Sequence, residues 1–255
     1  MSTVNPKAGP PAGLRRTHHA RWTRRVARRL RLAAAWAADY AYVARWQVQE
    51  FLVRRDPSRY LNPAPGVPRR EDVVLIPGVY ENWQFLRPLA ESLAEQGHPV
   101  HAVAALGYNR GRIDEMARRV EAYMESAGLQ DTLIVAHSKG GLIGKQVLLG
   151  RQGQRIRRMV AVNTPFSGSP YARLFFVPSI RAFSPRNALL RSLQASLDAN
   201  ARITSIYASF DPHIPGGSRL DGARNIQISG MGHFRPLGDP GLHRLVLREL
   251  DANVR

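Results

Sequence analysis

The segment between residues 133 and 149 constrains the fold of this chain more than any other. Four apolar residues at 133–136 are typical of a buried strand, and a helical pattern begins at Lys139, with only two residues between them. So short a connection lifts its serine, Ser138, above the sheet, and the residues two positions away on either side must be small to avoid a clash. Ala136 and Gly140 meet that requirement. The pattern therefore predicts a strand, a sharp turn and a helix, with the Ser138 hydroxyl presented at the turn.

Short apolar runs alternate with helical patterns through the chain after residue 70. We expect an α/β fold with a mainly parallel sheet and helices on both faces, because strands buried on both sides need crossover helices to connect them. The expected strands are Asp72–Ile76, Pro99–Leu106, Thr132–Ala136, Met159–Val162, Ile203–Ala208 and Asn225–Ile228. The expected helices are Trp83–Gln96, Arg112–Ser126, Lys139–Leu149 and Leu242–Asp251.

A serine hydroxyl is a weak nucleophile unless a base takes its proton and an acid orients that base. The expected strands at 203–208 and 225–228 are each followed by a loop that holds one candidate, Asp211 in the first loop and His233 in the second. The carboxyl ends of parallel strands meet at one edge of a sheet, where ligands bind. The sequence therefore predicts a catalytic triad in which Ser138 is the nucleophile, His233 the base and Asp211 the acid.

Other residues compete for these two roles. His213 is a second candidate for the base, but it shares a loop with Asp211 and would leave His233 unexplained. Asp221 and Asp239 are weaker candidates for the acid. An Asp-Pro pair such as the one at 211–212 also starts many ordinary turns, so a purely structural role for this aspartate is an equal alternative.

Two backbone N–H groups are expected to stabilise the oxyanion that forms when a serine attacks a carbonyl group. One belongs to Lys139, at the positive end of the helix after the turn. The other should come from the loop after the first strand, where Gly78 permits a tight backbone and Val79 is the best candidate for the donor. An ordinary connection between strand and helix is the alternative for that loop.

Together these residues resemble the α/β-hydrolase superfamily, in particular its lipase- and esterase-like branch, over residues 70–250. The resemblance implies a serine hydrolase that cleaves carboxylic esters through an acyl-serine intermediate without a cofactor. An acyltransferase with the same triad and a non-catalytic, membrane-associated binding protein are the alternatives. The motifs that carry the family resemblance are Pro77-Gly78-Val79, Ala136-His137-Ser138-Lys139-Gly140-Gly141, Thr164-Pro165-Phe166-Ser167-Gly168-Ser169, Asp211 and Gly232-His233.

This sequence departs from the family pattern at several points. Ala136 stands where the usual Gly-x-Ser-x-Gly motif has its first glycine, and Pro77 stands where lipases often have a histidine. The sheet is expected to start at Val73, without the first hairpin of the full fold. The first 65 residues match no part of the family.

An insertion at about 166–200 separates two of the expected strands and is rich in apolar residues. In this fold such an insertion forms a cap over the active site, and an apolar cap would favour an apolar acyl chain or a lipid ester as substrate. A cap that only completes the core is an equal alternative. Its apolar residues are Phe166, Tyr171, Leu174, Phe175, Phe176, Val177, Ile180, Phe183 and Leu189.

The charge of the chain is concentrated at its N-terminus. Residues 1–70 carry 15 of the 37 lysines and arginines and three acidic residues, and so hold +12 of the formal net charge of +18. We expect a disordered basic start at 1–20, a basic amphipathic helix and proline-rich linker at 21–65, and the hydrolase domain at 66–255. The helix has an apolar residue every three or four positions: Trp22, Val26, Leu30, Ala33, Ala37, Ala41, Ala44, Val48 and Phe51.

Three interpretations of this helix remain open. It lies on an anionic membrane surface, with arginines at the head groups and tryptophans at the interface; it packs on the hydrolase domain; or, least favoured, it binds nucleic acid. A twin-arginine export signal around Arg24-Arg25 is also conceivable, although Asp39 ends an apolar stretch of only about minimal length.

The chain has no cysteine, which fits a reducing compartment and excludes disulfides and thiolate chemistry. We therefore expect a cytoplasmic protein, peripheral at the membrane if the helix binds lipid. The histidines at 18, 19, 98, 101 and 243 share no metal-ligand spacing, so no metal is expected. His137 precedes the serine and is expected to pack against the flank of the sheet.

Overall fold

The computed structural model describes residues 12–53, 55–170, 172 and 183–252. Its centre is a six-stranded sheet in which every neighbouring pair is parallel, in the order β2-β1-β3-β4-β5-β6. This confirms the expected fold class. The strands are β1 (Val73–Ile76), β2 (Val100–Ala102), β3 (Thr132–His137), β4 (Ile156–Val162), β5 (Ile203–Phe210) and β6 (Arg224–Met231).

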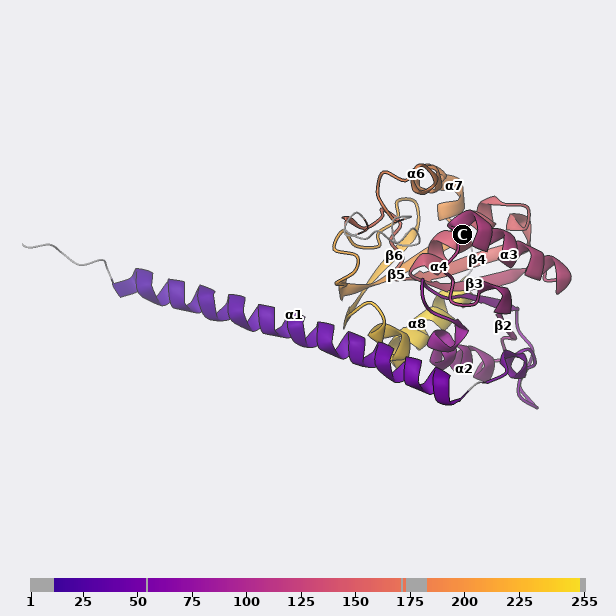
Figure 1. Ribbon diagram of the computed structural model, residues 1–255, viewed down its shortest axis with the longest axis horizontal. Coiled ribbons are helices and arrows are strands. Elements are labelled where there is room, and N and C mark those ends of the chain that lie inside the picture. Colours follow the sequence, from indigo (N-terminus) through magenta and orange to yellow (C-terminus); the bar gives the residue numbers. More distant parts are fainter. Residues whose placement is uncertain (1–11, 54, 171, 173–182, 253–255) are drawn as a thin grey trace, which may run out of the picture.

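Helices cover both faces of the sheet (Figure 1). Alternate strand residues point to opposite sides, so Val74 and Ile76 pack with α3 and α4 while Val73 and Leu75 pack with α2 and α8. The helices are α2 (Arg87–Glu95), α3 (Ile113–Ser126), α4 (Lys139–Leu149), α6 (Ala188–Ala195), α7 (Leu197–Asn200) and α8 (Pro240–Asp251). Short 3-10 helices lie at Pro57–Tyr60 (η1), Trp83–Leu86 (η2), Ala104–Leu106 (η3), Gly153–Arg155 (η4) and Arg235–Gly238 (η6).

Two elements differ from the sequence prediction. The strand expected at 99–106 pairs only over Val100–Ala102, because β2 is an edge strand whose chain turns into η3 just beyond this pairing. The helix expected at 83–96 divides into η2 and α2. Pro88 has no N–H to donate to the carbonyl group four residues earlier, so a continuous α-helix cannot pass through it.

The N-terminal helix α1 (Ala12–Leu52) begins ten residues before the first position of the expected apolar pattern, so residues 12–20, which we expected to be disordered, are helical. Its second half packs over η2 and η6, whereas its first half extends well beyond the sheet (Figure 1). The contact face contains Ala35, Asp39 and Trp46. The predicted apolar stripe is largely exposed on the other side, and the side chain of Phe51 lies outside the described residues.

The described part of the insertion at 166–200 joins the core. Phe166, Phe183 and Leu190 are buried in the same cluster as α3 and α4, Leu189 packs against it, and Gln194 Nε2 donates a hydrogen bond to the carbonyl oxygen of Phe166. This part therefore completes the core. The apolar residues Tyr171, Leu174, Phe175, Phe176, Val177 and Ile180 lie outside the described residues.

Candidate active site

Ser138 occupies a strained turn between β3 and α4. Its φ of 51° and ψ of −122° lie where residues with a side chain are rarely found, and such strain concentrates at functional sites. A Cβ on Gly140 would lie 2.0 Å from the carbonyl oxygen of Ile76, and one on Gly141 would lie 2.0 Å from Thr164 Oγ1. The turn can therefore lie this close to β1 and to the loop after β4 only because both residues are glycine.

Ser138, His233 and Asp211 form a continuous hydrogen-bonded chain. His233 Nε2 lies 2.9 Å from Ser138 Oγ, and His233 Nδ1 lies 2.7 Å from Asp211 Oδ2. Asp211 and His233 follow β5 and β6 at the carboxyl edge of the sheet. The other carboxylate oxygen of Asp211 accepts the N–H groups of His213 and Ile214, which fixes its orientation.

The competing residues lie elsewhere. His213 Nε2 faces Tyr40 Oη at 3.5 Å, and its ring centre is 5.0 Å from that of His233. Asp239 caps α8 by accepting the N–H of Gly241. Asp221 is exposed, with Arg219 3.9 Å away. None of these three occupies the position that bonds the Ser138 hydroxyl.

The electrostatics of the site favour a charged His233–Asp211 pair. Burial alone lowers the pKa of His233, but the charge and hydrogen bond of Asp211, with smaller contributions from Glu81 and Asp39, raise the pKa above its usual value. Burial opposes ionisation of Asp211, yet His233 and the hydrogen bond from the His213 N–H lower the pKa of this carboxyl group overall. An imidazolium at 233 is therefore stabilised by a carboxylate already in place.

The backbone carbonyl group of His233 is held by two buried side chains. His137 Nε2 donates to it at 3.0 Å and Asn163 Nδ2 donates to it at 2.8 Å. His137 Nδ1 lies 2.9 Å from the carboxylate of Glu81, which also accepts the N–H of Gly78 at 2.8 Å. The expectation that His137 only packs is too simple, because it links the loop after β1 to the loop of His233.

The backbone N–H of His233 is held from the opposite side by α1. The Asp39 carboxylate, which is 0% exposed, accepts the N–H groups of His233, Phe234 and Arg235 at 2.7–2.8 Å. This role was not predicted from the sequence, in which Asp39 only ended an apolar stretch. Asp39 and Glu50 are the two acidic residues of this helix, and their scarcity was the available signal.

The two candidate oxyanion donors lie on adjacent elements. Val79 is in the loop after β1, which is paired with β3, and Lys139 is the first residue of α4, where backbone N–H groups lack partners within the helix. The buried Lys139 ammonium donates to the carbonyl oxygens of Asn109 and Gly111, and burial lowers its pKa to about 8. Asn109 in turn donates to the carbonyl oxygen of Pro77 at 2.7 Å, so one network supports both loops.

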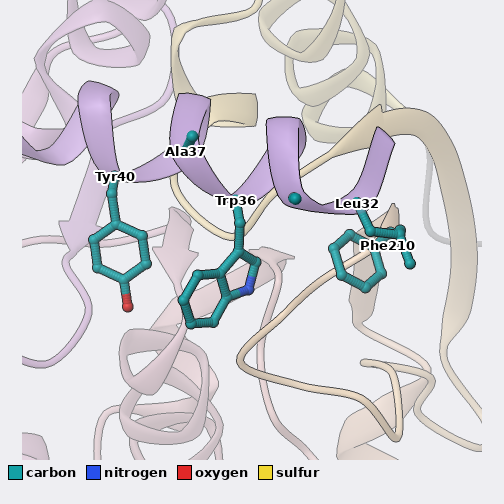
Figure 2. A pocket seen from close by; sticks show the side chains of 6 residues that line it. Leu32, Trp36, Ala37, Tyr40 and Phe210 are labelled. Atoms are coloured by element: carbon teal, nitrogen blue, oxygen red, sulfur yellow. The ribbon is translucent and has the colours of Figure 1, made fainter. Parts of the chain in front are cut away.

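An open apolar groove of about 540 Å³ lies beside this site, between α1 and the end of β5. Figure 2 shows Leu32, Trp36 and Tyr40 projecting from one side of α1, with Phe210 beside Leu32. The ring of Trp36 stacks on His213 at 6.5 Å, with 7° between the planes. Because His213 also contacts His233, a single imidazole separates the groove from the candidate base.

Within the described residues, no group of three or more histidines, aspartates or glutamates is placed to hold a metal ion. Among the described helices, none is long and apolar enough to cross a membrane.

Comparisons with known proteins agree with this architecture. A family model described as the alpha/beta hydrolase fold matches residues 73–194. Similar solved structures include an extracellular α/β-hydrolase from a Paenibacillus species (20% identity, TM-score 0.53, covering 71% of this chain and 99% of that one). A second is a monoacylglycerol lipase from Paleococcus ferrophilus (16% identity, TM-score 0.54, covering 72% of this chain and 95% of that one). A third is the 2-hydroxy-6-oxo-6-phenylhexa-2,4-dienoate hydrolase of Rhodococcus sp. strain RHA1 (16% identity, TM-score 0.54, covering 74% of this chain and 92% of that one). At these identities the structural matches establish the fold alone.

Proposed function

We propose that this chain, whose residues 73–194 match a model of the alpha/beta hydrolase fold, is a serine hydrolase that cleaves carboxylic esters of apolar or lipid-like substrates. The observation that carries the proposal is the hydrogen-bonded chain from Ser138 through His233 to Asp211, which starts at a strained strand-to-helix turn. Such an arrangement is suited to acyl transfer, since it provides a nucleophile, a base and an acid that orients the base.

In the proposed mechanism, Ser138 Oγ attacks the ester carbonyl carbon while His233 Nε2 takes the hydroxyl proton. The N–H groups of Val79 and Lys139 stabilise the oxyanion, and Asp211 stabilises the imidazolium. His233 then gives its proton to the leaving alkoxide, and the alcohol departs from the acyl-serine. A water molecule, activated by the same histidine, hydrolyses the acyl-enzyme and releases the acid.

The groove beside the site favours an apolar substrate. Its volume lies within the range of small-molecule sites, and its lining is almost entirely apolar. An acyl chain that extends from the reacting carbonyl group past His213 would lie along Trp36 and Phe210. Each buried methylene is worth about 0.8 kcal/mol, so the preference for longer chains should depend on this lining.

Labelling with a fluorophosphonate tests the enzymatic proposal directly. We expect the full-length protein to be labelled and Ser138→Ala not to be labelled. Hydrolysis of p-nitrophenyl esters of increasing chain length then tests the substrate class. Trp36→Ala should lose the preference for long chains, whereas Trp22→Ala, which changes an exposed tryptophan of the same helix away from the groove, should keep it.

The same measurements separate the alternatives. Absence of both labelling and hydrolysis would indicate a non-catalytic binding protein that has kept the fold. Ester products that incorporate an added alcohol in preference to water would indicate an acyltransferase with the same triad. Label on Ser138 together with release of free acid supports the hydrolase.

We further propose that α1 binds an anionic lipid surface. The apolar stripe that includes Trp22, Leu30 and Val48 is exposed, at 65%, 66% and 56%, on the side of the helix away from the sheet. Arg24, Arg25, Arg28, Arg29 and Arg31 are exposed on the same part of α1. An amphipathic helix with arginines beside aromatic and aliphatic residues suits the head-group region of a bilayer.

Co-sedimentation with phosphatidylglycerol-containing vesicles tests this surface. Removing the N-terminal segment would also remove Asp39, so substitutions are preferable to truncation. Replacing Arg24, Arg25, Arg28 and Arg29 by glutamine should weaken binding roughly 10³-fold at low salt, since each charge contributes about 1 kcal/mol. A control variant replaces four exposed arginines of the hydrolase domain, at 112, 118, 151 and 219. Equal binding by both variants, or binding to duplex DNA but not to vesicles, would contradict the proposal.

A further inference from the structure

Helix α1 lies outside the part of the chain that matches the family model, yet it reaches the loop of the candidate base. We propose that Asp39 is a positioning residue for His233, so that the N-terminal helix is an integral part of the active site. This inference rests on the proposed hydrolase function for its catalytic consequence, but its structural core can be tested without a substrate.

Asp39 accepts hydrogen bonds from three consecutive backbone N–H groups of a segment that is distant in the chain. Asp39 Oδ2 accepts the N–H of His233 at 2.8 Å, and Asp39 Oδ1 accepts those of Phe234 at 2.8 Å and Arg235 at 2.7 Å. The first of these pairs is separated by 194 residues. A carboxylate that accepts three backbone N–H groups at the start of a short helix, here η6, acts as its cap and fixes the direction in which the chain enters it.

The fit between the two segments leaves no room for a side chain. Gly232 has a φ of 111°, and a Cβ on it would lie 2.5 Å from Asp39 Oδ1. On the other side of η6, a Cβ on Gly238 would lie 2.8 Å from the ring of Tyr42, one turn further along α1. The glycines at both ends of the His233 loop therefore let α1 approach its backbone closely.

Asp39 completes a clamp on the histidine backbone. The N–H of His233 donates to Asp39, and the carbonyl group of His233 accepts hydrogen bonds from His137 and Asn163. With both peptide groups of His233 fixed, the imidazole is aimed at Ser138 by rigid elements. Geometry of this kind matters because a displacement of about 1 Å at a reacting group can lower the rate on the order of 10²-fold.

Asp39 also acts on the imidazole through its charge. The titratable groups that face His233 are Asp211, Glu81 and Asp39, which raise its pKa, and the neighbouring His213 and His137. Removing the negative charge of Asp39 is therefore expected to lower the pKa of His233. A substitution that loosened α1 without changing its charge would have no such effect, so comparing the two kinds of variant separates the action of Asp39 on His233 from general stability.

The test compares Asp39→Asn and Asp39→Ala with two matched controls in the full-length chain. Trp46→Leu weakens the packing of α1 through a buried residue of the same contact face, without changing charge. Asp56→Asn removes the same charge from an exposed position. The readouts are the pKa of His233 from an NMR titration, the acid limb of the pH profile of kcat/KM, and kcat and KM for a p-nitrophenyl ester.

We expect Asp39→Asn to lower the pKa of His233, to move the acid limb to lower pH, and to reduce kcat about tenfold with KM nearly unchanged. Asp39→Ala, which leaves three N–H groups without an acceptor, should reduce kcat on the order of 10²-fold. Both controls should keep the pKa of the wild-type protein.

The proposal is overturned if Asp39→Asn keeps the wild-type pKa of His233 and the wild-type kcat. It is also overturned if Trp46→Leu reproduces the full effect of the Asp39 variants, since Asp39 would then only stabilise the helix. If the wild-type protein neither hydrolyses esters nor reacts with a fluorophosphonate, the proposed function fails. The NMR titration would still decide whether Asp39 acts on His233.

Discussion

The Ser138 turn and the His233 loop meet at one site but are held in place in different ways. The turn is built by consecutive residues of β3 and α4, and its shape follows from a buried strand, a serine and two glycines. The His233 loop is held by Asp39, His137 and Asn163, which are 194, 96 and 70 residues away. A nucleophile can therefore be recognised from a local pattern, whereas the placement of its base depends on partners that only folding brings together.

The largest expected effect concerns the identity of the base in the distant loop. His233→Ala should lower kcat/KM for a p-nitrophenyl ester by about 10⁴- to 10⁶-fold, because the Ser138 proton loses its acceptor. His213→Ala removes a ring that contacts His233 but does not bond the serine, and should lower it by no more than about tenfold. Comparable losses in the two variants would reject the assignment.

The local turn can be broken by one methyl group. In Gly140→Ala the new Cβ would meet the backbone of Ile76 at 2.0 Å, so we expect a stability loss of about 1–3 kcal/mol and an activity loss on the order of 10²-fold. Gly144→Ala, in the same helix, meets the sulfur of Met159 at 2.6 Å, at the flexible end of a side chain. Its activity should stay near wild type. Urea unfolding and ester hydrolysis measure both effects, and a fully active Gly140→Ala protein would contradict the steric argument.

Glu81 connects the two regions, since it binds the Gly78 N–H and the His137 ring that supports His233. Glu81→Gln preserves the size of the side chain but places an NH₂ group where one acceptor is needed. We expect about a tenfold lower kcat and a loss of about 1–3 kcal/mol in the free energy of unfolding. Glu91 is a partly exposed glutamate that contacts Tyr60 and Arg87. The free energy of unfolding of Glu91→Gln should stay within about 0.5 kcal/mol of the wild-type value. Equal activity and equal stability of the two variants would show that Glu81 does not support the site.

The smallest expected effect is a displacement along the pH axis. The candidate base works only when deprotonated, and Asp211 raises the pKa of His233 despite the opposing effect of burial. Activity should therefore fall, as pH decreases, at a value above the ordinary histidine pKa of about 6.5. Asp211→Asn removes the carboxylate and should move this limb to lower pH. A wild-type acid limb well below 6.5 would contradict the electrostatic account.

The reliability of the sequence predictions follows the same division between local and distant contacts. Five of the six strands, α3, α4 and α8 lie where the apolar pattern predicted them, β2 is shorter than predicted, and Ser138, Asp211 and His233 meet in the expected order. The face through which α1 docks was not predicted from the sequence. Apolar spacing selected the stripe with Leu30 and Val48, but the helix packs through a face with Asp39 at its centre. A periodicity argument cannot recognise a buried carboxylate whose partners are backbone N–H groups.

The amino-acid sequence by itself determined the parallel sheet, the strained serine turn and the three candidate triad residues. Each of these follows from the apolar pattern of adjacent residues or from glycines that permit one backbone shape. Only the tertiary structure decided that α1 belongs to the site, that Asp39, His137 and Asn163 hold the His233 loop, and that an apolar groove opens beside it. The physical reason is that hydrogen bonds to backbone groups carry no sequence signature at the accepting or donating residue, so their partners are fixed only when the packed elements meet.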